Sequence, residues 1–156
     1  MLSPVTFTLI KPASVGRGHT FDILKQITEQ GFSIERIRHQ NQCRTTMTVL
    51  YAENQGRPYF DGLIDFMSSG SIVALIVKAK GEEIDAIARF RDLIGATKSA
   101  EAKPGTLRHA FGGHKWNPNA PIADNAVHAS DSITAVNREA KLFFPDFDIS
   151  EYVSQG

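Results

Sequence analysis

The chain has 156 residues, 42% of them hydrophobic and 22% charged, which is the size and composition of a globular protein with a substantial core. Seventeen basic and seventeen acidic residues give no formal net charge, which argues against a protein that holds nucleic acid through many phosphate contacts. The longest apolar run, residues 72–77, is far shorter than the roughly 20 residues that cross a bilayer.

The N-terminal residues lack the basic start and apolar stretch of a secretory signal. The single cysteine, Cys43, excludes an intramolecular disulfide and a thiolate metal cluster. We therefore expect a cytoplasmic protein with no membrane partner, in which Cys43 is an ordinary core or surface residue.

Strands and helices alternate in the first part of the chain. Apolar alternation predicts strands at residues 5–10 and 32–38, the second with one irregularity. Between them, Gly16-Arg17-Gly18 predicts a turn, and an amphipathic helix follows that ends at Gly31. The apolar residues of this helix are Phe21, Ile23, Leu24 and Ile27.

The middle of the chain is harder to assign. Residues 44–53 fit a helix by their apolar spacing and a strand by their three threonines. Residues 59–67 show helical spacing, and the serine- and glycine-rich residues 68–71 end that helix. Residues 72–77 are apolar on both faces, which is typical of a central strand.

The last part of the chain begins with a predicted helix at residues 82–94, which ends at Gly95 and buries Ile84, Ile87, Phe90 and Ile94. Residues 96–124 are rich in proline and glycine and predict a long loop, a kind of segment that is usually functional or disordered. A short strand at 125–129 follows, and Ser130-Asp131-Ser132 caps a last helix that runs to about Phe143.

This order of elements predicts an α+β fold. We expect a ferredoxin-like sandwich with a four-stranded antiparallel sheet, helices packed on one face of it, and a long inserted loop before the last strand. No composition break, repeat or low-complexity tract divides the chain, so residues 1–156 are expected to form a single domain.

Among the candidate chemical groups, His128 is the most informative. It lies at the end of a short strand, directly before a helix start rich in serine and aspartate. An imidazole has an unperturbed pKa near ~6.5, so a neutral, nucleophilic ring is available to attack phosphorus. Such a ring needs a partner on its second nitrogen, and Glu139, in the following helix, is available. A lone histidine is nevertheless more often structural than catalytic.

Other patterns limit the kind of site. No G-x-x-x-x-G-K-[ST] loop is present, which excludes a P-loop nucleotidase. The five histidines form no H-x-H or H-x-x-x-H pair, so a histidine-rich metal site is not expected. Lys11 at a strand end and Thr97 just after Gly95 are positioned to meet a phosphate, although each also has an ordinary structural explanation.

Four segments together resemble the nucleoside diphosphate kinase family. Asn125-Ala-Val-His128-Ala-Ser130-Asp131-Ser132 is similar to the active-site signature N-x-x-H-[GA]-S-D-x. Leu9-Ile-Lys11-Pro12 resembles the end of the first strand of that family. Arg57-Pro58-Tyr59-Phe60 resembles its R-P-F-F segment, and Lys103-Pro104-Gly105-Thr106-Leu107-Arg108 its K-P-G-T-[IL]-R segment. The matches occur in the order of the family and extend over nearly the whole chain.

The resemblance implies a ping-pong kinase that balances nucleoside triphosphate pools. A nucleoside triphosphate such as ATP gives its γ-phosphoryl group to His128, which passes it to a nucleoside diphosphate. Ser130 and Glu139 correspond to the residues that fix the histidine, and Tyr59, with Leu63 beside it, to the aromatic that stacks on the base. The phosphate and sugar contacts correspond to Lys11, Tyr51, Arg91, Thr97, Arg108 and Asn125. Lys11 also counts among the catalytic residues.

The resemblance also implies that Mg2+ arrives with the nucleotide phosphates and occupies no dedicated protein site. A homo-oligomer is implied as well, as a hexamer, tetramer or dimer. The chain departs from the family between Arg108 and His128, where residues around 113–124 lengthen a loop that in relatives helps build the nucleotide pocket and the oligomer contacts.

Two other functions are compatible with this fold class. An inactive, kinase-like interaction protein would have lost the histidine or its phosphate contacts, which this sequence keeps. A module of the RNA-recognition type would need a basic face and aromatic residues on adjacent strands. The neutral charge and the lack of such a strand disfavour it, and no specific nucleic acid partner is expected.

Overall fold

The computed structural model describes residues 1–41, 43–82, 84–113 and 124–153. In this part of the chain, one antiparallel sheet has the strand order β2-β3-β1-β4. Its strands are β1 (Val5–Ile10), β2 (Phe32–Gln40), β3 (Ile72–Ala79) and β4 (Val127–Ala129). The predicted four-stranded ferredoxin-like sheet is thereby confirmed.

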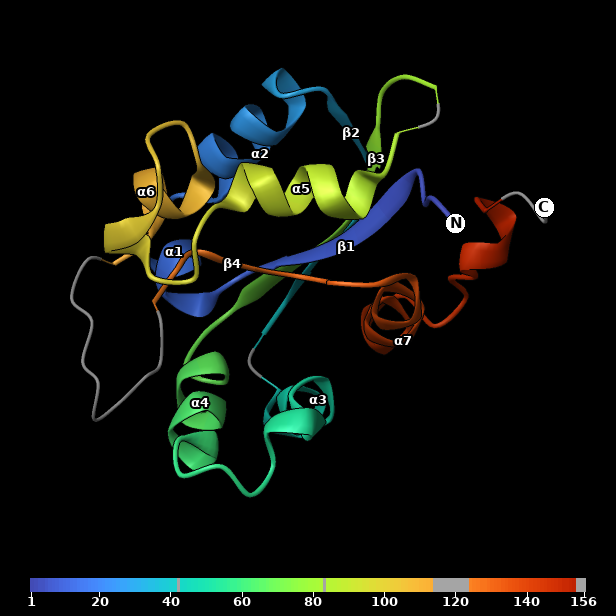
Figure 1. Cartoon of the computed structure of the whole chain (residues 1–156). Helices are drawn as coiled ribbons and strands as arrows, with labels where there is room; N and C mark the ends of the chain where they lie inside the picture. The colour runs from blue at the N-terminus through green and yellow to red at the C-terminus, as the bar shows by residue number, and fades with distance from the viewer. Residues whose placement is uncertain (42, 83, 114–123, 154–156) are drawn as a thin grey trace.

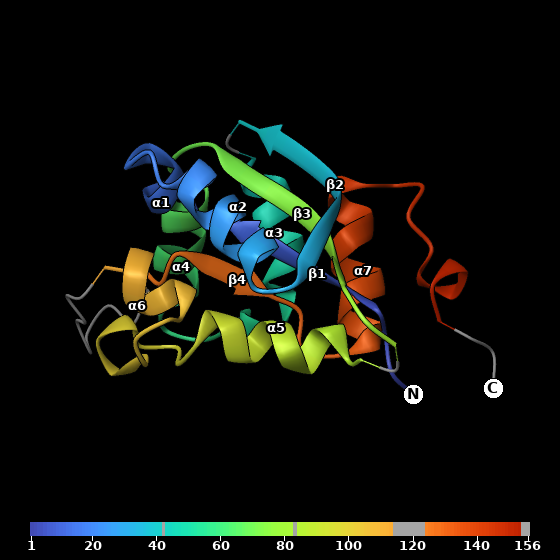
Figure 2. The same ribbon diagram turned by 90° about the horizontal axis from the view of Figure 1, so that it is seen from above.

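Helices cover both faces of this sheet (Figures 1 and 2). The helices α2 (Thr20–Glu29) and α5 (Ala86–Ile94) lie on one face. The opposite face is covered by α3 (Arg44–Leu50), α4 (Phe60–Met67) and α7 (Ile133–Phe143). The expectation of helices on a single face was therefore wrong.

The sequence of β3 explains why both faces need a cover. Ala74 and Ile76 point into one hydrophobic core, and Val73, Leu75 and Val77 point into the other. Successive side chains of a strand face opposite sides, so an uninterrupted apolar strand requires helices on both. The apolar character of residues 72–77, correctly predicted as a central strand, already contained this information.

Most predicted elements are confirmed, with shifted ends. The irregularity in the second strand is a change of register between Ile34 and Arg36. Gly31 follows α2 with a φ of 90°, and Gly95 ends α5 with a φ of 87°, a left-handed conformation that suits glycine. Phe21, by contrast, does not join the core, because 82% of it is exposed.

Several short helices were not predicted. Residues 12–16 form α1 (Pro12–Gly16) where only a turn was expected, and α6 (Leu107–Phe111) lies inside the predicted loop. The ambiguous residues 44–53 are helical, as α3 followed by η1 (Ala52–Asn54). Two further turns of 3-10 helix are η2 (Ser99–Glu101) and η3 (Ile149–Glu151). Most of the predicted inserted loop, residues 114–123, falls outside the described residues.

None of the described helices is long and apolar enough to cross a membrane.

Helix α7 begins shortly after β4, and Ser132 caps it by accepting a hydrogen bond from the backbone N–H of Ala135 at 3.1 Å. This connection places the residues that follow His128 at the start of a helix, as the sequence predicted.

Candidate active site

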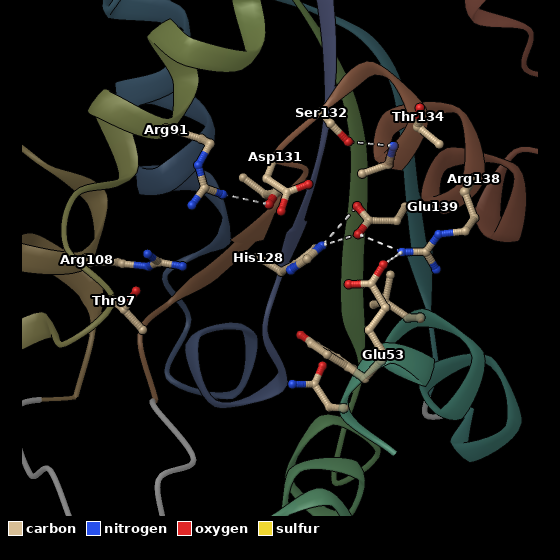
Figure 3. A pocket seen from close by; sticks show the side chains of 15 residues that line it. Glu53, Arg91, Thr97, Arg108, His128, Asp131, Ser132, Thr134, Arg138 and Glu139 are labelled. Atoms are coloured by element: carbon tan, nitrogen blue, oxygen red, sulfur yellow. Dashed lines mark hydrogen bonds and ion pairs between the residues drawn. The ribbon is translucent and has the colours of Figure 1, made fainter. Parts of the chain in front are cut away.

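A pocket of about 290 Å³ opens beside β4 (Figure 3). The residues that line it lie between Leu50 and Glu139 in the sequence, and the elements that supply them include α3, η1, α5, α6, β4 and α7. Of the residues predicted for the site, the pocket is lined by Tyr51, Arg91, Thr97, Arg108, His128 and Glu139.

His128 is the middle residue of β4 and pairs with Leu9 of β1. The hydroxyl of Thr8 donates a hydrogen bond to the carbonyl oxygen of His128 at 2.7 Å, which fixes the backbone of the histidine. The side chain is 19% exposed, so the ring is held within the protein and yet reachable from the pocket. Figure 3 shows the ring pointing toward Glu139.

The second nitrogen of the imidazole has the partner that the sequence predicted. His128 Nε2 lies 3.1 Å from both carboxylate oxygens of Glu139, and the Ser130 hydroxyl donates a short hydrogen bond to the same carboxylate. Burial alone would raise the pKa of Glu139. The hydrogen bonds with His128 and Ser130 and the charges of His128 and Arg138 lower it on balance. An ionised Glu139 favours a proton on Nε2, which leaves the lone pair on Nδ1.

Two guanidinium groups face the pocket across from Glu139 (Figure 3). Arg91 of α5 donates to the carbonyl of Ala129 at 3.2 Å, and Arg108 of α6 donates to the carbonyl of Val127 at 3.1 Å. Burial and the charge of Arg91 lower the pKa of Arg108 to about 10. Because two cations repel each other at short range, their placement in one pocket indicates an anionic ligand.

Lys11 and Asn125 form a buried pair next to these arginines. The ammonium of Lys11 donates to Asn125 Oδ1 at 2.5 Å, and Asn125 Nδ2 donates to the carbonyl of Thr97 at 2.9 Å. Burial and the charge of Arg108 lower the pKa of Lys11 to about 7. The structure thus brings Lys11 next to Asn125, which lies 114 residues further along the chain and is itself bonded to Thr97. All three residues were predicted for the site.

A strained turn separates Asn125 from His128. Ala126 has a φ of 70°, and the N–H of Val127 donates to the carbonyl of Asn125 at 2.8 Å, which closes a γ-turn. A residue other than glycine in this conformation costs roughly 1–3 kcal/mol and persists only when its surroundings fix it. The N–H of Lys11 donates to the carbonyl of Ala126 at 2.9 Å and so supplies part of that restraint.

Tyr51 contributes a buried hydroxyl to the pocket. Its ring meets the His128 ring edge-on, with 5.7 Å between the centroids. The hydroxyl has no hydrogen-bond partner among the described residues. Burial and the charge of Glu139 raise the pKa of Tyr51, so the phenol stays protonated and can donate to a ligand.

Five predicted residues do not line the pocket: Lys11, Asn125, Ser130, Tyr59 and Leu63. The first three are hydrogen-bonded to one another or to lining residues, as described above. The Tyr59 hydroxyl accepts a hydrogen bond from Asn54 Nδ2 at 2.8 Å, and Asn54 in turn lines the pocket. Leu63 lies on α4, half-buried against the hydrophobic core. Tyr59 is therefore one residue removed from the pocket, and Leu63 belongs to the helix that follows it.

Several lining residues were missed by the sequence analysis. They are Glu53, Asn54, Asp131, Ser132, Thr134 and Arg138. Arg138 lies 3.7 Å from Glu139 and 3.9 Å from Glu53. The only sequence feature that could have identified Arg138 as a site residue is its position directly before Glu139 in a helix, and most arginines on a helix surface have no such role.

No group of three or more His, Cys, Asp or Glu side chains suited to a metal ion occurs in the parts of the chain that the structure describes.

Comparison with known proteins identifies the family. The family model described as nucleoside diphosphate kinase matches residues 5–149. A nucleoside diphosphate kinase of Archaeoglobus fulgidus is 37% identical over 92% of this chain and 88% of its own.

Solved structures agree. The nucleoside diphosphate kinase of Aquifex aeolicus has a TM-score of 0.77 and 31% identity, over 96% of this chain and 98% of its own. A halophilic nucleoside diphosphate kinase of Halobacterium salinarum, solved in complex with CDP, has a TM-score of 0.77 and 30% identity, over 99% of this chain and 93% of its own. This chain belongs to the nucleoside diphosphate kinase family, and is a phosphotransferase that moves phosphoryl groups from nucleoside triphosphates to nucleoside diphosphates.

Proposed function

We propose that the phosphoryl group passes through a phosphohistidine on His128. The observation that carries this proposal is the hydrogen bond between His128 Nε2 and Glu139, which directs the Nδ1 lone pair away from the carboxylate. In the first step Nδ1 attacks the γ-phosphorus of a nucleoside triphosphate, the N–P bond forms, and the bond to the bridging oxygen breaks to release a nucleoside diphosphate. In the second step the terminal phosphate oxygen of another diphosphate attacks the phosphohistidine, and the N–P bond breaks.

The cations of the pocket supply the stabilisation that this transfer needs. Charge spreads over the equatorial oxygens of the transferred group, so catalysis depends on positioning and on fixed positive charge. Arg91 and Arg108 face the pocket, and Lys11 is held beside Arg108 by Asn125. We assign these residues, with Tyr51 and Thr97, to the phosphates and the sugar of the nucleotide.

We assign the base to Tyr59, with Leu63 nearby on α4. Tyr59 is connected to the pocket through its hydrogen bond with Asn54. An aromatic ring stacks on any base, so this contact allows many different nucleotides to be used.

Enzymes that transfer phosphoryl groups between nucleotides generally use a divalent metal ion, and we propose Mg2+ for this chain. The site fits an ion that is carried by the substrate, since Glu53 and Asp131 line the pocket and can accept hydrogen bonds from metal-bound water. Mg2+ held there would reduce the negative charge of the nucleotide phosphates.

We also propose that the protein is a homo-oligomer in the cytoplasm, with residues 1–156 acting as one domain. β2 lies at an edge of the sheet, beside an apolar groove whose lining includes Phe21 and Ile37, which are 82% and 54% exposed. An unpaired edge strand next to exposed apolar residues favours pairing with the same strand of a second copy.

The test of the phosphohistidine uses γ-labelled ATP and GDP. The protein is incubated with labelled ATP, separated from it, and then mixed with unlabelled GDP. We expect an acid-labile, base-stable label on the protein, followed by labelled GTP. His128→Ala is expected to take up no label, because the imidazole that accepts the group is gone.

A matched control uses His39→Ala, because His39 lines the separate groove beside β2 and lies outside the pocket. This variant should be labelled like the wild type. A wild type without label, or a His128→Ala variant labelled to the same extent, would contradict the proposed mechanism.

A further inference from the structure

Arg17, which follows α1, joins two segments that lie far from it in the sequence. Its Nη1 donates to Asp124 Oδ2 at 2.6 Å, and its Nη2 donates to Asp124 Oδ1 at 3.0 Å. The same Nη2 donates to the carbonyl of Phe111, the last residue of α6, at 3.0 Å. One planar guanidinium therefore fixes the end of α6 and the residue directly before Asn125.

A second contact holds the backbone of Asp124. The N–H of Gly113 donates to the carbonyl of Asp124 at 2.5 Å. A Cβ atom on Gly113 would lie 2.7 Å from Asp124 Oδ2, which is closer than such atoms approach, so a larger residue here would displace the Asp124 side chain. Asp124 is thus held both through its backbone carbonyl, by Gly113, and through its carboxylate, by Arg17.

The position of Asp124 matters because of the residue that follows it. Asn125 binds Lys11 through Oδ1 and the carbonyl of Thr97 through Nδ2. On its other side is the γ-turn at Ala126, whose positive φ needs external restraint. If Asp124 were free to move, the turn could relax toward a more favourable conformation and carry Asn125 away from Lys11.

We infer that Arg17 is a positioning residue of this kinase: by holding Asp124, it keeps Asn125 in place and, through Asn125, the Lys11 ammonium at the phosphate pocket. The inference rests on the proposed role of Lys11 in binding phosphate. The effect is on position more than on stability, since the two side chains are 38% and 27% exposed, and ion pairs at such exposure contribute little to folding.

Asp124 has a second effect on Lys11, through its charge. Burial and the charge of Arg108 lower the pKa of Lys11, and the carboxylate of Asp124 acts in the opposite direction and raises it. Asp124 therefore helps to keep Lys11 charged near neutral pH. The two effects on Lys11 can be separated experimentally. Arg17→Ala removes the restraint on the position of Asp124 but keeps its carboxylate, whereas Asp124→Asn removes the carboxylate itself.

The first experiment compares Arg17→Ala with Arg36→Ala in the full-length protein. Arg36 forms a similar ion pair with Asp146 at 2.7 Å, outside the residues that line the pocket. We expect Arg17→Ala to lower kcat by about 10- to 100-fold with a smaller change in KM, because a displaced phosphate contact acts mainly in the transition state. Arg36→Ala is expected to keep kcat within about twofold, as a surface substitution away from the site.

Arg17→Lys tests the geometry of the contact. A lysine keeps the positive charge but cannot bind both carboxylate oxygens and the Phe111 carbonyl in one plane. We expect a kcat between those of the wild type and Arg17→Ala. If Arg17→Ala does not fold, the comparison of Arg17→Lys with Arg36→Lys decides the question in the same way.

The second experiment measures kcat against pH. Activity should fall on the alkaline side as Lys11 loses its proton, with Arg108 and Asp124 as the charged groups that act on it. Asp124→Asn is expected to move this alkaline limb to lower pH, because the carboxylate that raises the pKa of Lys11 is gone. Arg17→Ala keeps the carboxylate in the protein, so it should lower kcat while moving the limb less than Asp124→Asn does.

Two results would overturn the inference. One is an unchanged kcat in Arg17→Ala, or a loss no larger than that of Arg36→Ala. The other is an alkaline limb in Asp124→Asn that coincides with that of the wild type. Both are distinct from a failure of the proposed function, in which the wild type itself takes no label from ATP on His128.

Discussion

At the scale of the residue, Lys11 shows how the site and the stability of the fold oppose each other. It is a charged side chain with only 6% of its surface exposed, and burial is the main reason that its pKa falls to about 7. In the unfolded chain the same group has a pKa near 10.5. The folded protein therefore binds the Lys11 proton less tightly than the unfolded chain does.

The sign of the effect on stability follows from this difference. Below pH 7 both states are protonated, and the buried charge lowers stability by its full amount. Between pH 7 and about 10.5 the unfolded chain binds more protons than the folded protein, so this group makes stability rise with pH. The contribution of Lys11 to the free energy of unfolding is thus least favourable at pH 7 and below.

Lys11→Met should stabilise the protein and inactivate it. Removing the buried charge outweighs the loss of the hydrogen bond to Asn125, and we expect a net gain on the order of 2 kcal/mol at pH 6. The gain should shrink as the pH rises from 7 toward 10. Phosphoryl transfer should fall by about 100-fold or more, as when a donor to the transition state is lost.

Urea unfolding of both proteins at pH 6 and pH 9, with kcat measured alongside, checks this prediction. A Lys11→Met variant that is less stable than the wild type at pH 6 would show that the buried charge is better compensated than its surroundings indicate. Unchanged kinetics would remove Lys11 from the site.

The sequence identified individual site residues where a short motif surrounds them. His128, Ser130 and Glu139 were predicted together, and the structure places their side chains in hydrogen-bond contact. Arg17 and Arg138 were missed, because an arginine in a turn or on a helix gives no local signal of the partner it will meet. Each of them pairs with a carboxylate that is distant in sequence: Arg17 with Asp124, and Arg138 with Glu53.

At the scale of the element, the start of α7 connects the nucleophile to the residue that orients it. Ser132 caps this helix, and Glu139 lies two turns further along it, facing back toward His128. The cap satisfies one of the free backbone N–H groups at the helix start. It therefore helps to fix the helix that carries Glu139.

Ser132→Ala should lower the free energy of unfolding by about 1 kcal/mol, the usual effect of losing such a cap. In a chain of this size that corresponds to a fall in Tm of roughly 2–4 °C. Ser132→Thr keeps a hydroxyl at the same place and should recover most of the loss. Thermal unfolding followed by circular dichroism measures both, and equal Tm values for Ala and wild type would show that the cap is dispensable.

The elements predicted from periodicity were the long ones. The helices α2, α4, α5 and α7 and the strands β1 and β3 each bury a set of apolar residues, which local sequence encodes directly. The short helices α1 and α6 have five residues each, too few for a periodic pattern to appear. They form because their surroundings hold them, as when Arg17 binds the end of α6.

At the scale of the whole molecule, the groove beside β2 is the surface through which we expect two copies to associate. Its apolar lining includes Phe21 and Ile37, on α2 and on the edge strand. Exposed apolar residues gathered on one surface usually mark a contact with another protein. A two-fold axis perpendicular to β2 would pair this strand with its copy and bury both residues in each copy.

Replacing these two residues with charged ones should separate the copies. We expect Phe21→Asp combined with Ile37→Lys to shift the protein to monomers in sedimentation velocity, because buried charges without partners oppose association. Val49→Asp serves as the control, since Val49 is also an exposed apolar residue, 46% accessible, but lies on α3. A double variant that sediments like the wild type would place the interface elsewhere.

The sequence by itself determined the order of the strands and of the longer helices, the family resemblance and most of the residues of the proposed phosphate site. These depend on local periodicity and on short motifs, in which neighbouring residues act together. Only the tertiary structure decided which helices cover each face of the sheet and that Arg17 binds Asp124. Each of these depends on contacts between distant segments, because a side chain meets its partner only after the sheet has brought β1 and β4 together.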